Sequence, residues 1–292
     1  MACCLPATGA STSTRQGQVI PLAGAQSVSI GAGQVWVTTL RSLVRIDPER
    51  RTVVARTRFP DLVASAVVDG KLVWVLTSSS SGGRGLLYSV DIASGRIVGA
   101  PVRLFPMAQG QVIIAGGSLW VTNDNHGRFG RLFRVDPSSR MVVAAVRIPD
   151  DPHSVVYAGG SIWVGQSDSG SVVRVDPQTG ALQGRPIDVG GALLALAADR
   201  GTVWVANTFS GRLAAIDVAT ARVRSDRPLA GLGGVSASHG HVWTFFFRTG
   251  EVAAVTGNQT STSRVPGGAD GIAASGRSLW VVNPLGVTLL DP

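Results

Sequence analysis

Two short polar segments carry the residues best suited to chemistry in this chain. They are residues 124–128 and 149–154, and both place a histidine close to carboxylates. A histidine in that setting can act as a general base or as a weak metal ligand. The open alternative is a solvated rim, on which aspartates accept hydrogen bonds from the backbone of turns. The residues concerned are Asp124, His126, Arg128, Asp150, Asp151 and His153.

A tryptophan repeat predicts the scaffold that holds these segments. The 292 residues include seven tryptophans, spaced by 38, 46, 43, 41, 39 and 37 residues. A glycine precedes each by three or four residues, and valine follows six of them. A period near 40 residues with one aromatic per unit is typical of a β-propeller, with one four-stranded blade per repeat. The tryptophans are Trp36, Trp74, Trp120, Trp163, Trp204, Trp243 and Trp280.

The third repeat shows the four strands expected in each blade, here called a to d from the inside outward. Residues 110–115 and 118–123 form an a–b hairpin, and residues 131–136 and 141–148 supply strands c and d. Neighbouring blades cover both faces of a blade, so we expect the tryptophans to form core rather than a ligand cage. An aspartate ends strand c in six repeats, where we expect it to cap the c–d turn. These aspartates are Asp47, Asp91, Asp136, Asp176, Asp217 and Asp291.

The two ends of the chain predict a closed ring. The last repeat stops after its strand c, and an unassigned strand at residues 17–22 precedes the first repeat. We expect the two to pair and complete a seventh blade, because closure removes the exposed edges of an open sheet. The predicted fold is all-β, a seven-bladed β-propeller of four-stranded antiparallel blades over residues 15–292. We expect residues 1–14 to be a flexible tether, because residues 5–14, which follow the cysteines, are small, polar and without a pattern.

In such a meander the d–a and b–c connections emerge on one face, and loops commonly carry function. The two polar segments belong to neighbouring blades on that face, so we expect His126 and His153 to share any catalytic site. Strand b ends in an amide in four repeats, and Asp270 opens the last strand a. We expect these groups to line a ligand site at the mouth of the channel. The candidate ligand contacts are Asn123, Asp124, Arg128, Asp150, Asp151, Gln166, Asn207, Asp270 and Asn283.

The charge and the cysteine content limit the kinds of partner and the cellular compartments that we expect for this protein. The net charge is +8, but the arginines are scattered over every repeat without a basic run, so we expect no nucleic-acid partner. No stretch approaches 18 consecutive apolar residues, so we expect no membrane span. The only cysteines are Cys3 and Cys4, and the polar tether after them fits the end of a bacterial lipoprotein signal. We expect one of them to be lipidated in the cell envelope; a cytoplasmic protein is the alternative.

The segment Gly-Gly-Ser-Leu-Trp-Val-Thr-Asn at residues 116–123, followed by Leu-Phe-Arg-Val-Asp-Pro at 132–137, resembles a known superfamily. It is similar to YVTN-type and streptogramin-lyase-like (virginiamycin B lyase-like) seven-bladed propellers, over nearly the whole chain. In the lyases, glutamates after the strand-b aromatic bind magnesium beside a catalytic histidine. The corresponding positions here are Asn123, Gln166, Asn207 and Asn283, none of them an acid. The resemblance therefore implies the fold and no metal site.

These observations favour a binding protein over an enzyme. We expect a monomeric propeller that recognises a protein or a glycan on its loop-rich face, with no cofactor. The alternative hypothesis is a lyase-like or hydrolytic enzyme that uses His153 together with His126. A cytoplasmic interaction scaffold is a third hypothesis.

Overall fold

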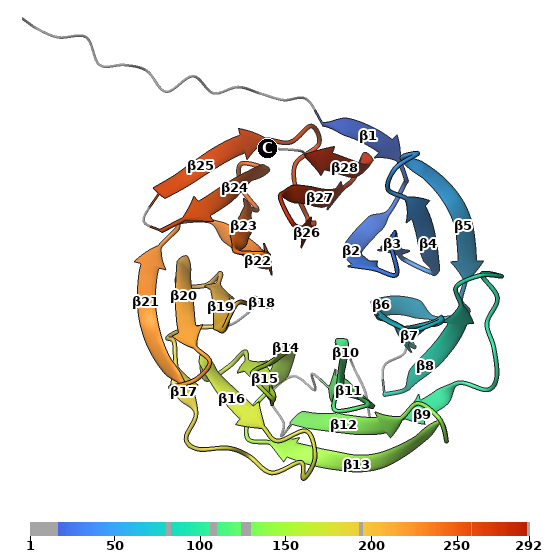
Figure 1. Ribbon diagram of the computed structural model, residues 1–292, viewed down its shortest axis with the longest axis horizontal. Coiled ribbons are helices and arrows are strands. Elements are labelled where there is room, and N and C mark those ends of the chain that lie inside the picture. The colour runs from blue at the N-terminus through green and yellow to red at the C-terminus, as the bar shows by residue number, and fades with distance from the viewer. Residues whose placement is uncertain are drawn as a thin grey trace, which may run out of the picture.

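A computed structural model of the protein describes residues 17–79, 83–105, 110–123, 130–192, 195–257 and 259–290. These residues form seven four-stranded antiparallel sheets, arranged as the blades of a ring (Figure 1). The predicted all-β, seven-bladed fold is confirmed. In this part of the chain no helix is long and apolar enough to cross a membrane.

The blades are numbered 1 to 7 in the order of their tryptophans. Strands a, nearest the ring axis, are β2 (Ala25–Gly31), β6 (Leu62–Asp69), β10 (Val112–Ala115), β14 (Pro152–Ala158), β18 (Ala195–Asp199), β22 (Leu232–Ser238) and β26 (Gly271–Ser275). Strands b are β3 (Gln34–Thr39), β7 (Leu72–Ser78), β11 (Ser118–Asn123), β15 (Ser161–Gln166), β19 (Thr202–Asn207), β23 (His241–Phe246) and β27 (Ser278–Asn283). Strands c are β4 (Ser42–Asp47), β8 (Gly85–Asp91), β12 (Gly130–Asp136), β16 (Ser171–Val175), β20 (Arg212–Asp217), β24 (Glu251–Thr256) and β28 (Gly286–Leu290). Strands d are β5 (Thr52–Arg58), β9 (Val102–Leu104), β13 (Met141–Ile148), β17 (Ile187–Asp188), β21 (Arg222–Pro228), β25 (Gln259–Arg264) and, for blade 7, β1 (Gln18–Pro21).

Each tryptophan packs between its own blade and the next one. Seven apolar clusters of described residues lie at the seven interfaces between blades, and each includes one tryptophan. Six tryptophans are buried, and Trp204 is half-buried between Ala197 and Ala215 on the neighbouring strands. An indole taken out of water contributes on the order of 4–6 kcal/mol before opposing terms are counted. The predicted role of the tryptophans as core is confirmed.

The ring closes between the first and last strands. β1 pairs antiparallel with β28, with Val19 opposite Thr288 and Ile20 opposite Val287. The side chains of Ile20 and Leu22 are buried in the cluster that also holds Trp280. The predicted pairing of the chain ends is confirmed, in a strand one residue shorter at each end than predicted.

The outermost strands have free edges that resist pairing with another chain. In β5, β13 and β21, the three longest strands d, one residue has no partner in strand c: Val54, Val143 and Arg224. Such a β-bulge twists an edge strand and interrupts the row of backbone groups that a second chain would need. The edges of β9 and β17 are only three and two residues long.

Candidate binding face

The meander gives the ring two different faces. The a–b and c–d connections lie on one, called here the turn face, and the d–a and b–c connections lie on the other, the loop face. The turn face consists of tight connections, such as the a–b hairpin of blade 3. There the backbone of Gly117 has a φ of 71°, a conformation that favours glycine. The described candidate residues all stand where strand a begins or strand b ends, and therefore on the loop face.

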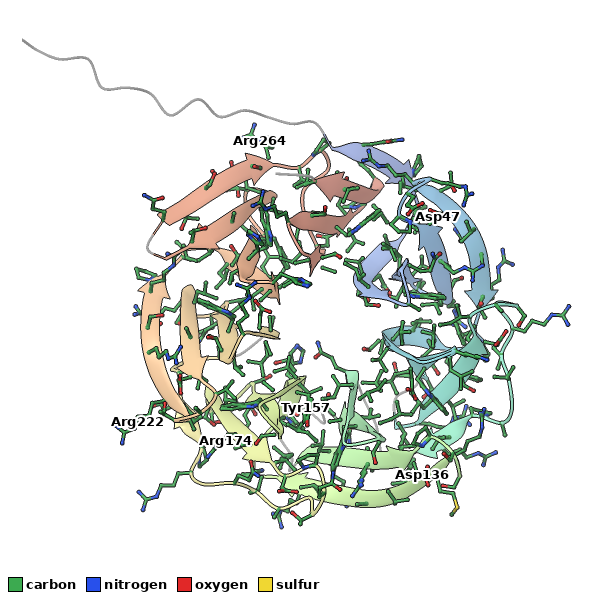
Figure 2. The ribbon with its side chains drawn as sticks, in the orientation of Figure 1. Asp47, Asp136, Tyr157, Arg174, Arg222 and Arg264 are labelled. Carbon is green, nitrogen blue, oxygen red and sulfur yellow. The ribbon has the colours of Figure 1, made fainter. Side chains whose placement is uncertain are left out.

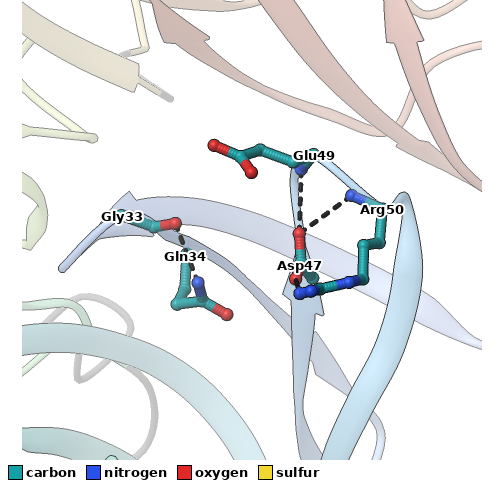
Figure 3. Close-up of polar contacts among 5 residues, drawn as sticks. All are labelled: Gly33, Gln34, Asp47, Glu49 and Arg50. Atoms are coloured by element: carbon teal, nitrogen blue, oxygen red, sulfur yellow. Dashed lines mark hydrogen bonds and ion pairs between the residues drawn. The ribbon is translucent and has the colours of Figure 1, made fainter.

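The aspartates that end strand c are structural. The Asp47 Oδ1 accepts the backbone N–H groups of Glu49 and Arg50, both at 2.9 Å, and the Arg50 guanidinium donates to Oδ2 at 2.8 Å (Figure 3). A carboxylate held this way fixes the c–d turn. Equivalent bonds from the backbone three residues further on reach Asp91, Asp136, Asp176 and Asp217.

The same hydrogen bonds lower the pKa of four of these carboxyls. Backbone N–H donors are the main cause for Asp47, Asp136 and Asp176, and the Ser94 hydroxyl is the main cause for Asp91. Donors stabilise the ionised form, so the proton leaves more readily. The predicted capping role is confirmed for all five described aspartates, whereas Asp291 lies outside the described residues.

His153 occupies an irregular point of strand a in blade 4. Pro152 pairs with Gln166 and Ser154 pairs with Gly165, so His153 is the extra residue of a β-bulge. Bulges turn a side chain away from the regular alternation and are common beside functional sites. The same strand is bulged at this level in blades 1, 2 and 6. The imidazole is half-buried, and the His153 carbonyl accepts the Thr122 hydroxyl of blade 3 at 3.3 Å.

Asp150 and Asp151 form the connection that leads into His153. The Asp150 Oδ2 accepts the Ser169 N–H at 2.6 Å, and the Asp151 carbonyl accepts the Ser167 N–H at 2.9 Å. Both donors belong to the b–c connection of the same blade, which begins at Gln166. The structure therefore brings Asp150, Asp151, His153 and Gln166 together on the loop face of blade 4.

The amides that end strand b are buried and support the loops. The Asn283 Nδ2 donates to the carbonyls of Pro266 and Gly268, both at 2.9 Å, and its Oδ1 accepts the Leu285 N–H at 2.9 Å. In blade 5 the Asn207 Oδ1 accepts the Ser210 N–H at 3.0 Å. The side-chain amide of Asn283, which we expected to contact a ligand, thus forms hydrogen bonds with the backbone of the loops instead.

The predicted ligand contacts are distributed around the ring rather than gathered at one point. Asn123, Gln166, Asn207 and Asn283 end strand b of blades 3, 4, 5 and 7, and Asp270 is exposed at the start of strand a in blade 7. Whether any of them binds a ligand stays a prediction.

Several predicted residues lie outside the described part of the chain. These are Asp124, His126, Arg128, Cys3 and Cys4. The shared site of His126 and His153 therefore stays a prediction, as does lipidation. Among the described residues, no three His, Cys, Asp or Glu side chains are grouped so that they could hold a metal ion.

Exposed apolar side chains lie at the loop tips, and three of them, Leu40, Phe209 and Leu285, were not predicted from the sequence. The three exposed phenylalanines of the described residues all lie on the loop face, and Phe209 is 84% exposed. Four tips lie in the b–c connections of blades 5, 6, 7 and 1, which are consecutive in the ring (Figure 1). We call these four the apolar tips: Phe209, Phe247, Leu285 and Leu40. A fifth exposed side chain, Phe105, follows strand d of blade 2.

The apolar tips are held by neighbouring groups. The rings of Phe247 and Phe245 meet edge to face at 5.2 Å between centroids, and Phe245 is buried. Leu285 covers Gly267, where an added Cβ would lie 2.7 Å from the leucine Cγ. The sequence signal for a tip is one large apolar residue inside a short b–c turn, as in Asn-Thr-Phe-Ser-Gly at residues 207–211.

A pocket of about 430 Å³ lies elsewhere, between strands a of blades 1 and 2. It is bordered by Ser29, Ile30, Gly31, Ala66, Val67 and Val68, which stand toward the turn face. None of the candidate residues lines it, so it is separate from the loop face.

Fold and site together define a seven-bladed β-propeller with exposed apolar side chains on its loop face. No protein-family model matches the chain, and no curated protein matches it by sequence. Solved propeller structures do match its structure, but their sequence identities to this chain are so low that the match shows the fold alone.

Three of these structures cover nearly the whole chain. A chain of Kuenenia stuttgartiensis hydrazine synthase has a TM-score of 0.77 at 13% identity, covering 97% of this chain and 99% of that one. A chain of the mitotic checkpoint complex has a TM-score of 0.75 at 14% identity, covering 100% and 98%. The β-propeller domain of Myceliophteria thermophila Cps50 (Swd1) has a TM-score of 0.74 at 12% identity, covering 96% and 99%.

Proposed function

We propose that this protein is a non-catalytic binding propeller that recognises another protein through its loop face. The observation that carries the proposal is the row of apolar tips on four consecutive blades, from Phe209 to Leu40. Exposed phenylalanine and leucine side chains lose unfavourable contact with water when a partner covers them. Aromatic anchors of this kind contribute much of the affinity at protein interfaces.

The arrangement of the blades supports recognition by a rigid surface. Each tip stands in a short connection between two strands that are packed into the blade. The tips are therefore already held in place, and little conformational entropy is lost when a partner binds them. A propeller as large as this one is also found in the mitotic checkpoint complex, which is a protein assembly.

A displayed-peptide selection tests this function even while the natural partner is unidentified. Peptides that bind the purified protein are synthesised and titrated against a tip variant, Leu40→Ser, Phe209→Ser, Phe247→Ser and Leu285→Ser. The matched control replaces four exposed apolar residues away from the loop face, Val54→Ser, Met141→Ser, Val143→Ser and Leu182→Ser.

We expect peptides rich in apolar residues whose affinity falls at least about tenfold for the tip variant and stays unchanged for the control. Equal losses in both variants would contradict the proposal, as would binding that the tip variant leaves intact.

We further propose that Cys3 or Cys4 carries a lipid that holds the protein at the bacterial cell envelope. The support is the placement of both cysteines ahead of a small, polar segment, with no other cysteine in the chain. When the gene is expressed together with its native upstream sequence in cells that are fed an alkyne-tagged fatty acid, we expect the protein to become labelled. Label that persists in the Cys3→Ser, Cys4→Ser double variant would refute the tether.

A second candidate function is a lyase-like enzyme, in line with the resemblance to streptogramin-lyase-like propellers. It is favoured by the bulge that places His153 on the loop face beside Asp150 and Asp151. Turnover of cyclic esters with added magnesium, abolished by His153→Ala, would support this function. No turnover by the unaltered protein would remove it.

A further inference from the structure

The positive charge of the protein is concentrated on its outer rim. The seven strands d contain eight arginines and two aspartates, a net charge of +6 out of +8 for the whole chain. In the described a–b and c–d turns and at the ends of the strands a and c that lead into them, seven basic residues are offset by eight acidic residues. Scattered along the sequence, the arginines gather in space because every fourth strand is an outermost one.

The rim arginines follow one another around most of the ring. They lie on β21, β25, β5, β9 and β13, whereas β1 in blade 7 and β17 in blade 4 contain no arginine. Figure 2 shows Arg222 and Arg264 at the outer edge of the ring. The eight are Arg56, Arg58, Arg103, Arg147, Arg222, Arg224, Arg227 and Arg264.

Five of these arginines are available to a partner. They are exposed, and none has a hydrogen bond or ion pair of its side chain within the described residues: Arg56, Arg58, Arg103, Arg222 and Arg264. By contrast, Arg224 pairs with Asp217, and Arg227 donates to the Gly257 carbonyl and the Thr260 hydroxyl. Guanidinium groups bind phosphate oxygens well, often through two parallel hydrogen bonds.

We propose that the outer rim binds a flexible linear polyanion of the polyphosphate type. A chain that runs along the rim can meet arginines on five blades, whereas a flat membrane would touch only one arc of the ring. Duplex DNA is too stiff to follow so tight a curve at low cost. Single-stranded nucleic acid is bound through aromatic stacking, and the strands d contain no aromatic residue.

Long-chain inorganic polyphosphate is the probe that tests this surface. The rim variant carries Arg56→Gln, Arg58→Gln, Arg222→Gln and Arg264→Gln. The matched control removes four exposed charges from the turn face, Lys71→Gln, Arg96→Gln, Arg200→Gln and Arg277→Gln, and so has the same net charge. Circular dichroism and thermal unfolding show that both variants are folded before binding is compared.

We expect the rim variant to bind polyphosphate at least about tenfold more weakly at moderate salt, with a salt dependence shallower by about three in log–log slope. The control should bind within about twofold of the unaltered protein. Equal weakening in both variants, or no weakening in either, would overturn the proposal. It would also fall if a single-stranded oligonucleotide of equal charge, or anionic vesicles, bound the rim more tightly than polyphosphate.

Discussion

At the scale of single residues, the loop face depends on buried amides. Asn283 makes three hydrogen bonds to backbone atoms of the two connections on either side, whereas the Asn207 Nδ2 has no partner among the described residues. A buried group that loses its partner keeps the cost of leaving water. The two asparagines therefore hold equivalent positions with unequal consequences for stability.

Replacement of these two asparagines should separate their roles. Asn283→Ala leaves two carbonyls and one N–H without partners, so we expect a loss of about 3 kcal/mol in the free energy of unfolding. Asn207→Ala should cost about 1 kcal/mol, since it removes a single hydrogen bond. Urea denaturation followed by tryptophan fluorescence measures both, and equal losses would contradict the assignment.

The turn aspartates predict how stability depends on pH. The pKa values of Asp47, Asp91, Asp136 and Asp176 are lower in the folded protein than in the unfolded chain. Their contribution to stability is therefore present in full above the unfolded pKa, near 3.9, and is lost as the pH falls through the lower folded values.

Below about pH 4, we expect the free energy of unfolding of the unaltered protein to fall more steeply with pH than that of a variant in which all four aspartates are replaced by asparagine. Asparagine does not titrate but keeps an acceptor oxygen for the backbone N–H groups of the turn. The variant therefore removes the titration while it keeps the hydrogen bonds that fix the turn. Urea titrations from neutral to acidic pH test this, and identical acid slopes in both proteins would refute the link.

At the scale of the strand, arginines on strand c join one blade to the next. The Arg134 guanidinium lies 5.5 Å from the centroid of the Trp120 ring and donates at 2.9 Å to both the Ser118 hydroxyl and the Gln178 carbonyl of blade 4. Blade 2 has Ser89 opposite Trp74, and there Arg140 from the c–d turn of blade 3 covers the ring at 5.4 Å. The cation over the indole thus comes from different elements in different blades.

Removal of this arginine should weaken one interface between blades. We expect Arg134→Ala to lower the free energy of unfolding by about 1–2 kcal/mol, through two lost hydrogen bonds and the lost contact with the ring. Arg131→Ala, on the same strand and exposed, should change it by less than about 0.5 kcal/mol. Equal effects of the two substitutions in thermal and urea unfolding would contradict this role.

The sequence predicted the strands well because each blade repeats one physical requirement. Tryptophan beside a glycine turn marks strand b in every blade, and the missing last strand pointed to residues 17–22 as its replacement. The bulge at His153 could not be predicted, since one extra residue in a strand leaves the apolar pattern intact. Leu40, Phe209 and Leu285 were not predicted, because the expected site was built mainly from polar residues and Phe209 stands in an otherwise polar turn.

At the scale of the whole molecule, stability depends on the pairing that closes the ring. Ile20 is buried between β28 and blade 1, and the described chain has no other contact that joins its two ends through paired strands. An open ring would expose two sheet edges to other chains.

Ile20→Asp should therefore open the ring. We expect a loss of at least about 4 kcal/mol, since a charge would be buried without a partner. The same variant should elute as larger species in size-exclusion chromatography. Gln18→Asp, an exposed position on the same strand, is the control and should remain monomeric. A monomeric Ile20→Asp variant of unchanged stability would contradict the role of this strand.

The asymmetry between the two faces is the central claim for function. Hydrogen exchange of the protein with and without a selected peptide tests it most directly, because protection reports which backbone groups a ligand covers. We expect protection in the b–c connections that hold Leu40, Phe209, Phe247 and Leu285, with unchanged exchange on the turn face. Protection confined to the a–b and c–d turns, with the loop face unaffected, would contradict the account.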